Sequence, residues 1–171
     1  MKKNIRDYAI LIFTGLIIVI LDQYTKNLVR QNLDYSQIWY LFDWEWLYPH
    51  VYIVHWYNKG AAFGMFQDGS MIFTILAIII SILIIVYFPR IAKEDWPLRL
   101  ALGLQLGGAV GNLIDRITVG HVTDFIAVEE FPVFNIADAS ITMGVVVLII
   151  GMWINEKEKE KAAGLEQNPD E

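Results

Sequence analysis

The stretch SMIFTILAIIISILIIVYF, residues Ser70–Phe88, runs for 19 residues without a charged side chain and is rich in isoleucine and leucine. As a helix with a rise of about 1.5 Å per residue, it spans roughly 28 Å, which is close to the thickness of a bilayer's hydrocarbon core. A charge-free apolar segment of this length is typical of a transmembrane helix. The stretch therefore predicts an integral membrane protein.

The composition of the whole chain agrees with this prediction. Its 171 residues are 56% hydrophobic, with a mean hydropathy of +0.43 and a net charge of −6. The negative charge argues against a nucleic-acid-binding protein, which typically needs a basic surface. Without cysteine, the chain has no disulfide framework, no thiolate metal site and no cysteine nucleophile. The spacing of His50, His55 and His121 does not suit metal ligation, so no metal and no cofactor is expected.

Three further segments can also cross a bilayer as helices. Four transmembrane helices are predicted in total, at about residues 8–29, 70–88, 97–116 and 132–154. Pro97 and Pro132 open the last two, since proline suits the first position of a helix. The charged tail, residues 155–171, is expected to form a short solvated helix that frays into disorder. Residues 1–171 are interpreted as one integral membrane domain.

Lysine and arginine are unevenly distributed along the chain. Nine of them lie in the N-terminus, around the connection between the second and third helices, and in the tail, whereas the opposite side holds four. Because positive charges accumulate on the cytoplasmic side of a membrane, both termini are predicted to be cytoplasmic. Residues of about 30–69 and 117–131 are then expected to face outward.

Nine aromatic residues lie between residues 38 and 57, in the outward part of the chain. Rings with a polar edge settle at the level of the lipid headgroups, so this segment is expected to lie on the outer leaflet. Alternatively it forms a small extracytoplasmic sheet, because VYIV at residues 51–54 has a high β-propensity. Both interpretations are compatible with each other.

Glycine recurs every four residues in the third helix, at Gly103, Gly107 and Gly111, with Gly108 beside them. Small residues at this spacing let a neighbouring helix approach closely, and helix packing is the favoured interpretation. The alternative is that Gly108 and Gly111 leave space for a ligand beside Asn112.

Polar side chains that are costly to bury in a membrane gather at one end of the predicted helices. Asp22 and Lys26 close the first helix, Asn112, Asp115 and Arg116 close the third, Asp124 follows in the loop, and Asn135 and Asp138 open the fourth. Within each helix these residues are three or four positions apart and share a face. All of these helix ends face outward in the predicted topology, so the polar groups are expected to converge near the outer surface.

The carboxylates of Asp124 and Asp138 are costly to place at a hydrophobic boundary, which argues against a purely structural role for them. Asp138 is expected roughly 9 Å inside its helix, six residues after Pro132. Two carboxylates that share a site cannot both ionise cheaply, so one retains its proton. Such a pair can activate a water molecule with one carboxylate and polarise a carbonyl group with the other. Arg116 is interpreted as a phosphate anchor, a counter-ion for Asp115 or a site residue.

Two other functions remain open on these residues. A transporter would place ionisable groups near the bilayer midplane, whereas the middles of these helices are apolar or glycine. A non-catalytic lipid-binding or assembly protein would use Arg116 and Lys59 to bind headgroup phosphates. In that protein Asp124 and Asp138 could be replaced freely.

Five short motifs carry a resemblance to a known family. They are DQYTK at residues 22–26, NKGAAF at 58–63, GNLIDR at 111–116, VTDF at 122–125 and FNIADASI at 134–141. With these motifs in this order, the chain resembles the lipoprotein signal peptidases of bacteria (signal peptidase II), which are membrane aspartic peptidases. The resemblance covers about residues 8–154. It implies a membrane α-helical fold of four transmembrane helices with a small extracytoplasmic β-cradle, and a short surface helix near the second motif.

The resemblance also implies a role for each polar residue. Asp124 and Asp138 would be the catalytic dyad, Asn58, Asn112, Arg116 and Asn135 would hold the substrate and the dyad, and Asp22, Lys26 and Asp115 would support them. The substrate would be a prolipoprotein whose lipobox cysteine carries diacylglycerol, cut just before that cysteine. The enzyme would work as a monomer among the lipids of the bacterial cytoplasmic membrane, with its active site near the outer leaflet. The 31 residues between Lys26 and Asn58 look longer and more aromatic than is typical, which leaves the shape of the cradle open.

Overall fold

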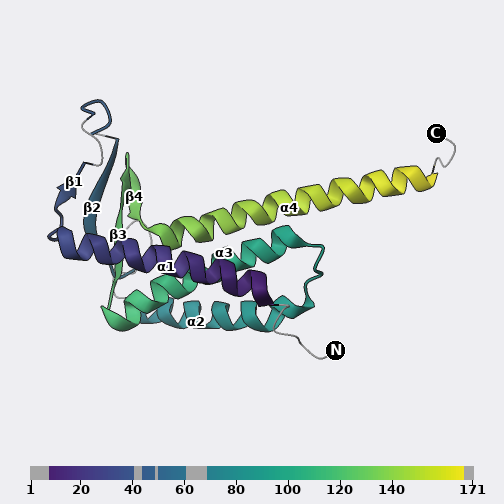
Figure 1. Ribbon diagram of the computed structural model, residues 1–171, viewed down its shortest axis with the longest axis horizontal. Helices are drawn as coiled ribbons and strands as arrows, with labels where there is room; N and C mark the ends of the chain where they lie inside the picture. Colours follow the sequence, from purple (N-terminus) through teal and green to yellow (C-terminus); the bar gives the residue numbers. More distant parts are fainter. Residues whose placement is uncertain (1–7, 41–43, 49, 61–68, 168–171) are drawn as a thin grey trace.

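The computed structural model describes residues 8–40, 44–48, 50–60 and 69–167, with side chains as far as residue 157. Within this part of the chain, four long helices carry a small antiparallel sheet at one end (Figure 1). The elements in chain order are α1 (Ala9–Asn32), β1 (Ile38–Trp39), β2 (Val51–Asn58), α2 (Ser70–Tyr87), the 3-10 turn η3 (Phe88–Arg90), α3 (Trp96–Thr118), β3 (Val122–Val128), β4 (Phe131–Phe134) and α4 (Ile136–Gln167). α1 begins and α4 ends at the end of the bundle away from the sheet (Figure 1).

Three of the described helices are long and apolar enough to cross a membrane. They are Ala9–Asn32, Ser70–Arg90 and Ile136–Lys157. The mostly helical architecture with a small sheet therefore agrees with the sequence-based prediction. α3, the third predicted span, is not among these candidates because it carries charged and amide side chains and four glycines.

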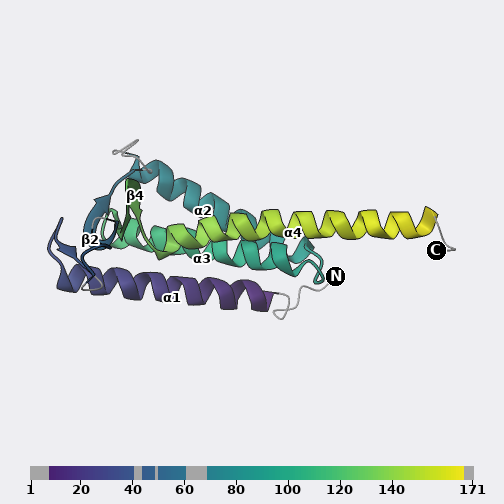
Figure 2. The same cartoon turned by 90° about the horizontal axis from the view of Figure 1, so that it is seen from above.

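α3 lies at the centre of the helices and packs against α1, α2 and α4 (Figure 2). The glycines of α3 make this contact close. A Cβ atom on Gly107 would lie 2.7 Å from the Cβ of Ile18, and one on Gly108 would overlap the carbonyl oxygen of Ala137. The prediction that these glycines serve helix packing is confirmed. Gly108 and Gly111 do not leave space for a ligand, because Ala137 of α4 and Asp22 of α1 fill the space beside them.

The substitution Gly108→Ala is expected to destabilise the fold, because the added methyl group would overlap Ala137 and lie 2.6 Å from Oγ of Ser140. Overpacking of this kind costs about 1–3 kcal/mol. Gly15→Ala is the matched control, since a Cβ atom there stays 3.7 Å from its nearest neighbour, the carbonyl oxygen of Gly103. Thermal unfolding of both variants in one detergent checks this. Equal midpoints for the two variants would contradict it.

The predicted start of the fourth helix at Pro132 is wrong. Phe131–Phe134 form β4, which pairs with β3 through Ile126 and Phe134 and through Val128 and Phe131. β4 is an edge strand, where proline is tolerated because one side of the strand has no partner. Asp138 is therefore the third residue of α4 and lies near its start, not deep inside the helix.

The charged tail is also more regular than predicted. α4 continues without a break to Gln167, so the described part of residues 155–171 extends the membrane-span candidate as one helix. This helix projects beyond the other three at the end away from the sheet (Figures 1 and 2).

The sheet has the strand order β1-β2-β3-β4, and every pair in it is antiparallel. The predicted strand at residues 51–54 is confirmed as the first half of β2. In the β2–β3 pair, Trp56 lies opposite Asp124 and Asn58 lies opposite Val122. Because side chains alternate along a strand, Asn58 and Asp124 share one face of the sheet, and Phe125 lies on the other face. The surface helix expected near the motif at residues 58–63 falls on residues 61–68, outside the described residues.

Candidate active site

Two carboxylates from different elements meet beside Asn135, at the junction between the sheet and α4. Asp124 lies in the middle of β3 with only 1% of its surface exposed, and Asp138 lies in the first turn of α4. Nδ2 of Asn135 donates to Oδ1 of Asp124 over 2.6 Å, and the backbone N–H of Asn135 donates to Oδ2 of Asp138 over 3.3 Å. One residue therefore connects both carboxylates.

Asn135 also caps the start of α4. Its Oδ1 accepts a hydrogen bond from the backbone N–H of Asp138 over 3.0 Å, while the carboxylate of Asp138 accepts from the backbone N–H of Asn135. This reciprocal pattern is a capping box, which satisfies two backbone donors at a helix start. The local sequence Asn135–Asp138 thus orients the Asp138 carboxylate, and the positive end of the helix dipole favours its negative charge.

Two further amide side chains hold the remaining carboxylate oxygens. Nδ2 of Asn58 donates to Oδ2 of Asp124 over 2.9 Å, and Nδ2 of Asn112 donates to Oδ1 of Asp138 over 2.8 Å. Each carboxylate therefore accepts two hydrogen bonds. Both aspartates are held in fixed positions by groups from separate elements.

Burial, as the largest cause, and the negative charge of Asp138 together raise the pKa of Asp124 to about 7. The hydrogen bonds from Asn58 and Asn135 oppose this effect, because they stabilise the ionised carboxylate. A carboxyl group with such a pKa exchanges its proton near neutral pH. This property suits a group that takes up and releases protons during a reaction.

A cavity of about 540 Å³ opens beside Asp138. Its polar lining includes Asn58, Asn112 and Arg116, and most of its remaining lining comes from apolar side chains of β4 and α4. Asp124 is not among the lining residues, but it is bonded to Asn58, which is. A volume in this range is typical of ligand-binding pockets, which span about 300–1,000 Å³.

Arg116 differs from the other predicted site residues. Within the described part of the chain its buried Nε atom has no hydrogen-bond partner, and its guanidinium lies 5.8 Å from the centre of the Phe73 ring. The interpretation of Arg116 as the counter-ion of Asp115 is wrong. Lys26, at 3.5 Å, and Arg30, at 3.1 Å, form ion pairs with that carboxylate. Arg116 instead contributes a positive charge and a buried donor to the cavity.

Lys26 and Asp22 form more than a local ion pair. Nζ of Lys26 is fully buried and lies 2.8 Å from Asp22, and it donates to Oδ1 of Asn112 over 2.9 Å. Oδ1 of Asp22 accepts from the backbone N–H of Ala137 over 2.9 Å. α1 is therefore bonded to α3 through Lys26 and to the start of α4 through Asp22. Asn112 in turn donates to Asp138, and Ala137 directly precedes Asp138 in the chain, so both bonds end at a neighbour of this carboxylate.

Sequence reasoning missed three members of this network, namely Gln23, Arg30 and Thr123. Nε2 of Gln23 donates to Asp22 and Asp115, and Nη1 of Arg30 donates to Asp115 and to Oγ1 of Thr123. Arg30 follows Lys26 at the same four-residue spacing that separates Lys26 from Asp22, so one helix face could have included it. For Thr123 no such signal exists, because its contact depends on how β3 packs against α1.

Eight of the nine predicted site residues therefore belong to one connected set of hydrogen bonds and ion pairs. They are Asp22, Lys26, Asn58, Asn112, Asp115, Asp124, Asn135 and Asp138. The ninth, Arg116, lines the same cavity as Asn58, Asn112 and Asp138. Residues from α1, α3, β2, β3 and α4 meet at this one place.

Comparison with known proteins gives consistent results over most of the chain. The family model for signal peptidase (SPase) II matches residues 14–154. The lipoprotein signal peptidase of Acinetobacter baumannii (strain ATCC 17978) is 39% identical over 164 residues, which cover 88% of each chain. The lipoprotein signal peptidase of Halalkalibacterium halodurans is 38% identical over 151 residues, which cover 86% of this chain and 94% of the relative.

The fold is similar to that of solved structures as well. A bacterial membrane enzyme solved at 2.3 Å by the in meso method superposes with a TM-score of 0.78 and 32% identity, over 87% of this chain and 90% of that one. A second such structure, at 1.9 Å, has a TM-score of 0.73 and 33% identity, over 83% and 91% of the two chains. On the family match and these relatives, the chain belongs to the signal peptidase II family.

Proposed function

We propose that this protein is an aspartic endopeptidase of the membrane that removes signal peptides from diacylglyceryl-modified prolipoproteins. It cuts the chain just before the lipidated cysteine. The observation that carries this proposal is that Asn135 connects Asp124 and Asp138 and that Asp138 lines a cavity of ligand size. The curated relatives named lipoprotein signal peptidase supply the substrate class.

In the proposed reaction the two carboxyl groups share one proton. The ionised carboxylate removes a proton from a water molecule, whose oxygen attacks the carbonyl carbon of the scissile peptide bond. The protonated carboxyl group donates a hydrogen bond to the carbonyl oxygen, where negative charge develops. The peptide C–N bond then breaks, and the amide nitrogen leaves with a proton from the pair. The products are a new carboxylate and the free amino group of the lipidated cysteine.

The amide side chains have separate parts in this mechanism. Asn135 and Asn58 hold Asp124, and Asn112 holds Asp138, so the reacting groups do not need to reorganise during the reaction. Asn58, Asn112 and Arg116 also line the cavity, where their free hydrogen-bonding capacity suits the backbone of an extended substrate. All of these groups come from a single chain, which is consistent with a monomeric enzyme.

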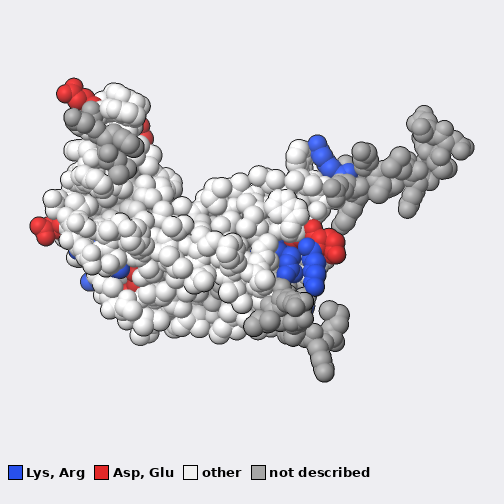
Figure 3. Space-filling model, viewed as in Figure 1, with Lys and Arg blue, Asp and Glu red and all other residues white. Residues whose placement is uncertain are grey.

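We also propose that four helices cross the membrane, with α3 as the fourth span. Lys, Arg, Asp and Glu lie at the two ends of the face seen in Figure 3, and a broad uncharged band separates them. α3 has ten buried residues and is surrounded by α1, α2 and α4. It therefore needs less apolar surface than a helix that faces lipid. In this arrangement the sheet and the two carboxylates lie near the outer leaflet of the bacterial cytoplasmic membrane.

The proposed orientation places both termini in the cytoplasm. Because the chain contains no cysteine, one introduced cysteine at an exposed position reports its own accessibility. In intact cells a membrane-impermeant thiol reagent should label Glu129→Cys, in the turn between β3 and β4. Lys157→Cys, near the far end of α4, should react only after the cells are permeabilised. Labelling of Lys157→Cys in intact cells would contradict the proposed orientation.

Purified full-length protein in lipid nanodiscs tests the activity itself. A diacylated prolipoprotein should be cut, and mass spectrometry should find the lipidated cysteine at the new N-terminus. The same precursor without its lipid is the control, and it should remain uncut. A chelator should leave the rate unchanged, since both proton transfers are assigned to carboxyl groups. Loss of activity with chelator and its recovery with zinc would contradict the mechanism.

A further inference from the structure

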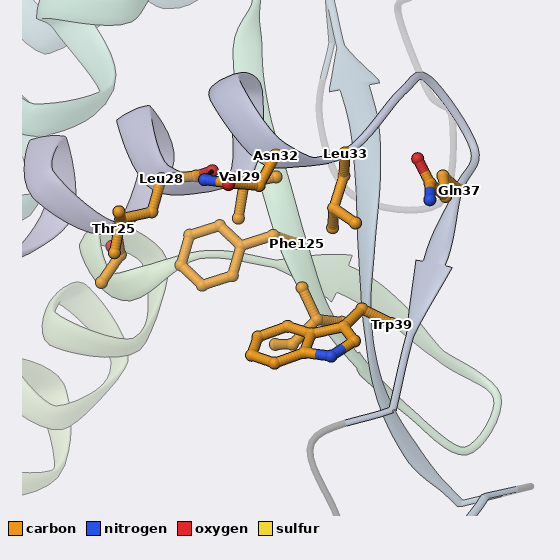
Figure 4. A pocket seen from close by; sticks show the side chains of 9 residues that line it. Thr25, Leu28, Val29, Asn32, Leu33, Gln37, Trp39 and Phe125 are labelled. Atoms are coloured by element: carbon orange, nitrogen blue, oxygen red, sulfur yellow. Dashed lines mark hydrogen bonds between the residues drawn. The ribbon is translucent and has the colours of Figure 1, made fainter.

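A second cavity, of about 570 Å³, lies on the opposite face of the sheet from Asp124. It is formed between the last turns of α1 and the strands β1, β2 and β3 (Figure 4). Its apolar walls are Leu28, Val29, Leu33, Trp39, Ile53 and Phe125. We call this cavity the α1–sheet groove.

The polar side chains at the groove do not change its apolar character. Oγ1 of Thr25 donates to the backbone oxygens of Leu21 and Asp22, and Nδ2 of Asn32 donates to the backbone oxygen of Leu28. Both side chains are therefore bonded back to α1. The third polar side chain of the lining, Gln37, accepts a hydrogen bond from the backbone N–H of Asp34 through its Oε1. The lining that remains for a ligand is almost entirely hydrocarbon.

The α1–sheet groove is separate from the candidate active site. Phe125 lies in the groove, whereas its neighbour Asp124 faces Asn58 and Asn135 on the other side of β3. The strand itself lies between the two cavities. An acyl chain attached to a substrate at Asp138 would have to pass through or around the sheet to reach this groove.

The position of the groove along α1 suggests the source of its ligand. With a rise of about 1.5 Å per residue, Thr25 lies roughly 24 Å and Asn32 roughly 34 Å from Ala9 along the helix axis. A hydrocarbon core of about 30 Å therefore ends beside the groove. The neighbouring surface of α1 is apolar and exposed, with Tyr24 at 62% and Leu28 at 41%. The groove is thus continuous with the surface that faces the bilayer.

We propose that the α1–sheet groove binds one acyl chain of a glycerophospholipid from the outer leaflet. The acyl chain would enter along α1 and fill the space beneath β1. This strand has only two residues and pairs with β2 alone. A bound chain would thereby hold β1 and the face of the sheet bearing Phe125 against α1. This inference is independent of the proposed peptidase activity, because it concerns a lipid of the membrane and not the lipid of the substrate.

A photoreactive lipid tests the proposal on the full-length protein. The probe is phosphatidylglycerol with a diazirine in the middle of one acyl chain, in nanodiscs of phosphatidylethanolamine and phosphatidylglycerol. After irradiation, peptide mapping should find the label on Trp39, Ile53 or Phe125, above the level on the exposed outer face of α2. Labelling of α2 and the groove at equal density would overturn the proposal, since it would indicate only surrounding lipid.

Leu28→Trp fills the groove, and Leu21→Trp is its matched control on the exposed surface of α1, where 48% of Leu21 is accessible. Leu28→Trp should lower groove labelling about ten-fold, because several methylene contacts are lost, and Leu21→Trp should not. Thermal unfolding midpoints close to that of the wild type verify that both variants fold. Undiminished labelling in Leu28→Trp would overturn the proposal. A diacylated prolipoprotein with the same diazirine should leave the groove unlabelled, and preferential labelling by it would overturn the phospholipid as the source.

Discussion

Replacing either Asp124 or Asp138 by asparagine should remove nearly all cleavage of a diacylated prolipoprotein. General acid–base assistance is commonly worth about 10²–10⁴-fold in rate, and both proton transfers of the proposed mechanism run through this pair. Asparagine has nearly the same shape as aspartate, but it cannot ionise at neutral pH. The turnover number, measured in nanodiscs, is the quantity that should fall.

Both variants should remain folded. Asp124 is almost fully buried and Asp138 is mostly buried. A neutral amide at either position costs less to bury than an ionised carboxylate. Asp34→Asn is the matched control, since Asp34 is exposed and lies outside the site, and it should retain full activity. The double variant should be little worse than either single variant, because groups that act as a unit are not additive. Cleavage by either single variant at nearly the wild-type rate would refute the aspartic mechanism.

The same pair should make the reaction sensitive to pH. Because burial and the charge of Asp138 raise the pKa of Asp124 to about 7, the pair retains one proton below this pH and loses it above. Turnover should therefore decline as the pH rises through about 7. A rate that stays constant to pH 9 would show that the reaction does not need the shared proton.

The sequence predicted the helices best where a single physical property dominates. Ser70–Phe88 is strongly apolar and has no charged side chain, and α2 with η3 covers this stretch almost residue for residue. The start of the fourth helix was misjudged because Pro132 suits both a helix start and an edge strand. Asn135 was the better indication, since an asparagine three residues before an acidic residue forms a capping box. Pairing with β3 decided the structure of Phe131–Phe134, and this pairing is not a local property.

The site was predictable in its members but not in its connections. Spacing by three or four residues placed Asp22 and Lys26 on one helix face, and the structure pairs them at 2.8 Å. No spacing could indicate that Asp22 would bond to Ala137, 115 residues later in the chain, or that Lys26 would bond to Asn112. Those contacts follow from the close packing of α3 against α1 and α4, which its glycines permit.

Replacement of Lys26 by methionine should destabilise the fold strongly. The Nζ atom of Lys26 is fully buried between Asp22 and Asp115, at 2.8 and 3.5 Å. Removing one partner of a buried ion pair leaves an uncompensated charge and typically costs about 3–5 kcal/mol. Lys157→Met, at an exposed position near the end of α4, is the matched control and should change little. The thermal unfolding midpoint of Lys26→Met should therefore lie clearly below that of Lys157→Met.

The Lys26→Met protein that folds should also turn over substrate more slowly than the wild type. Its turnover should fall less than that of Asp138→Asn. Lys26 donates to Oδ1 of Asn112, whose Nδ2 donates to Asp138, so its loss leaves the amide of Asn112 less firmly oriented. The carboxylates themselves remain, and the reduction in turnover should stay below the 10²–10⁴-fold expected when one of them is replaced. Adding Asp22→Asn to Lys26→Met removes the uncompensated charge and should restore part of the lost stability, since the two residues are coupled. A Lys26→Met variant with wild-type stability and no turnover would contradict this interpretation, because it would give Lys26 a direct part in the reaction.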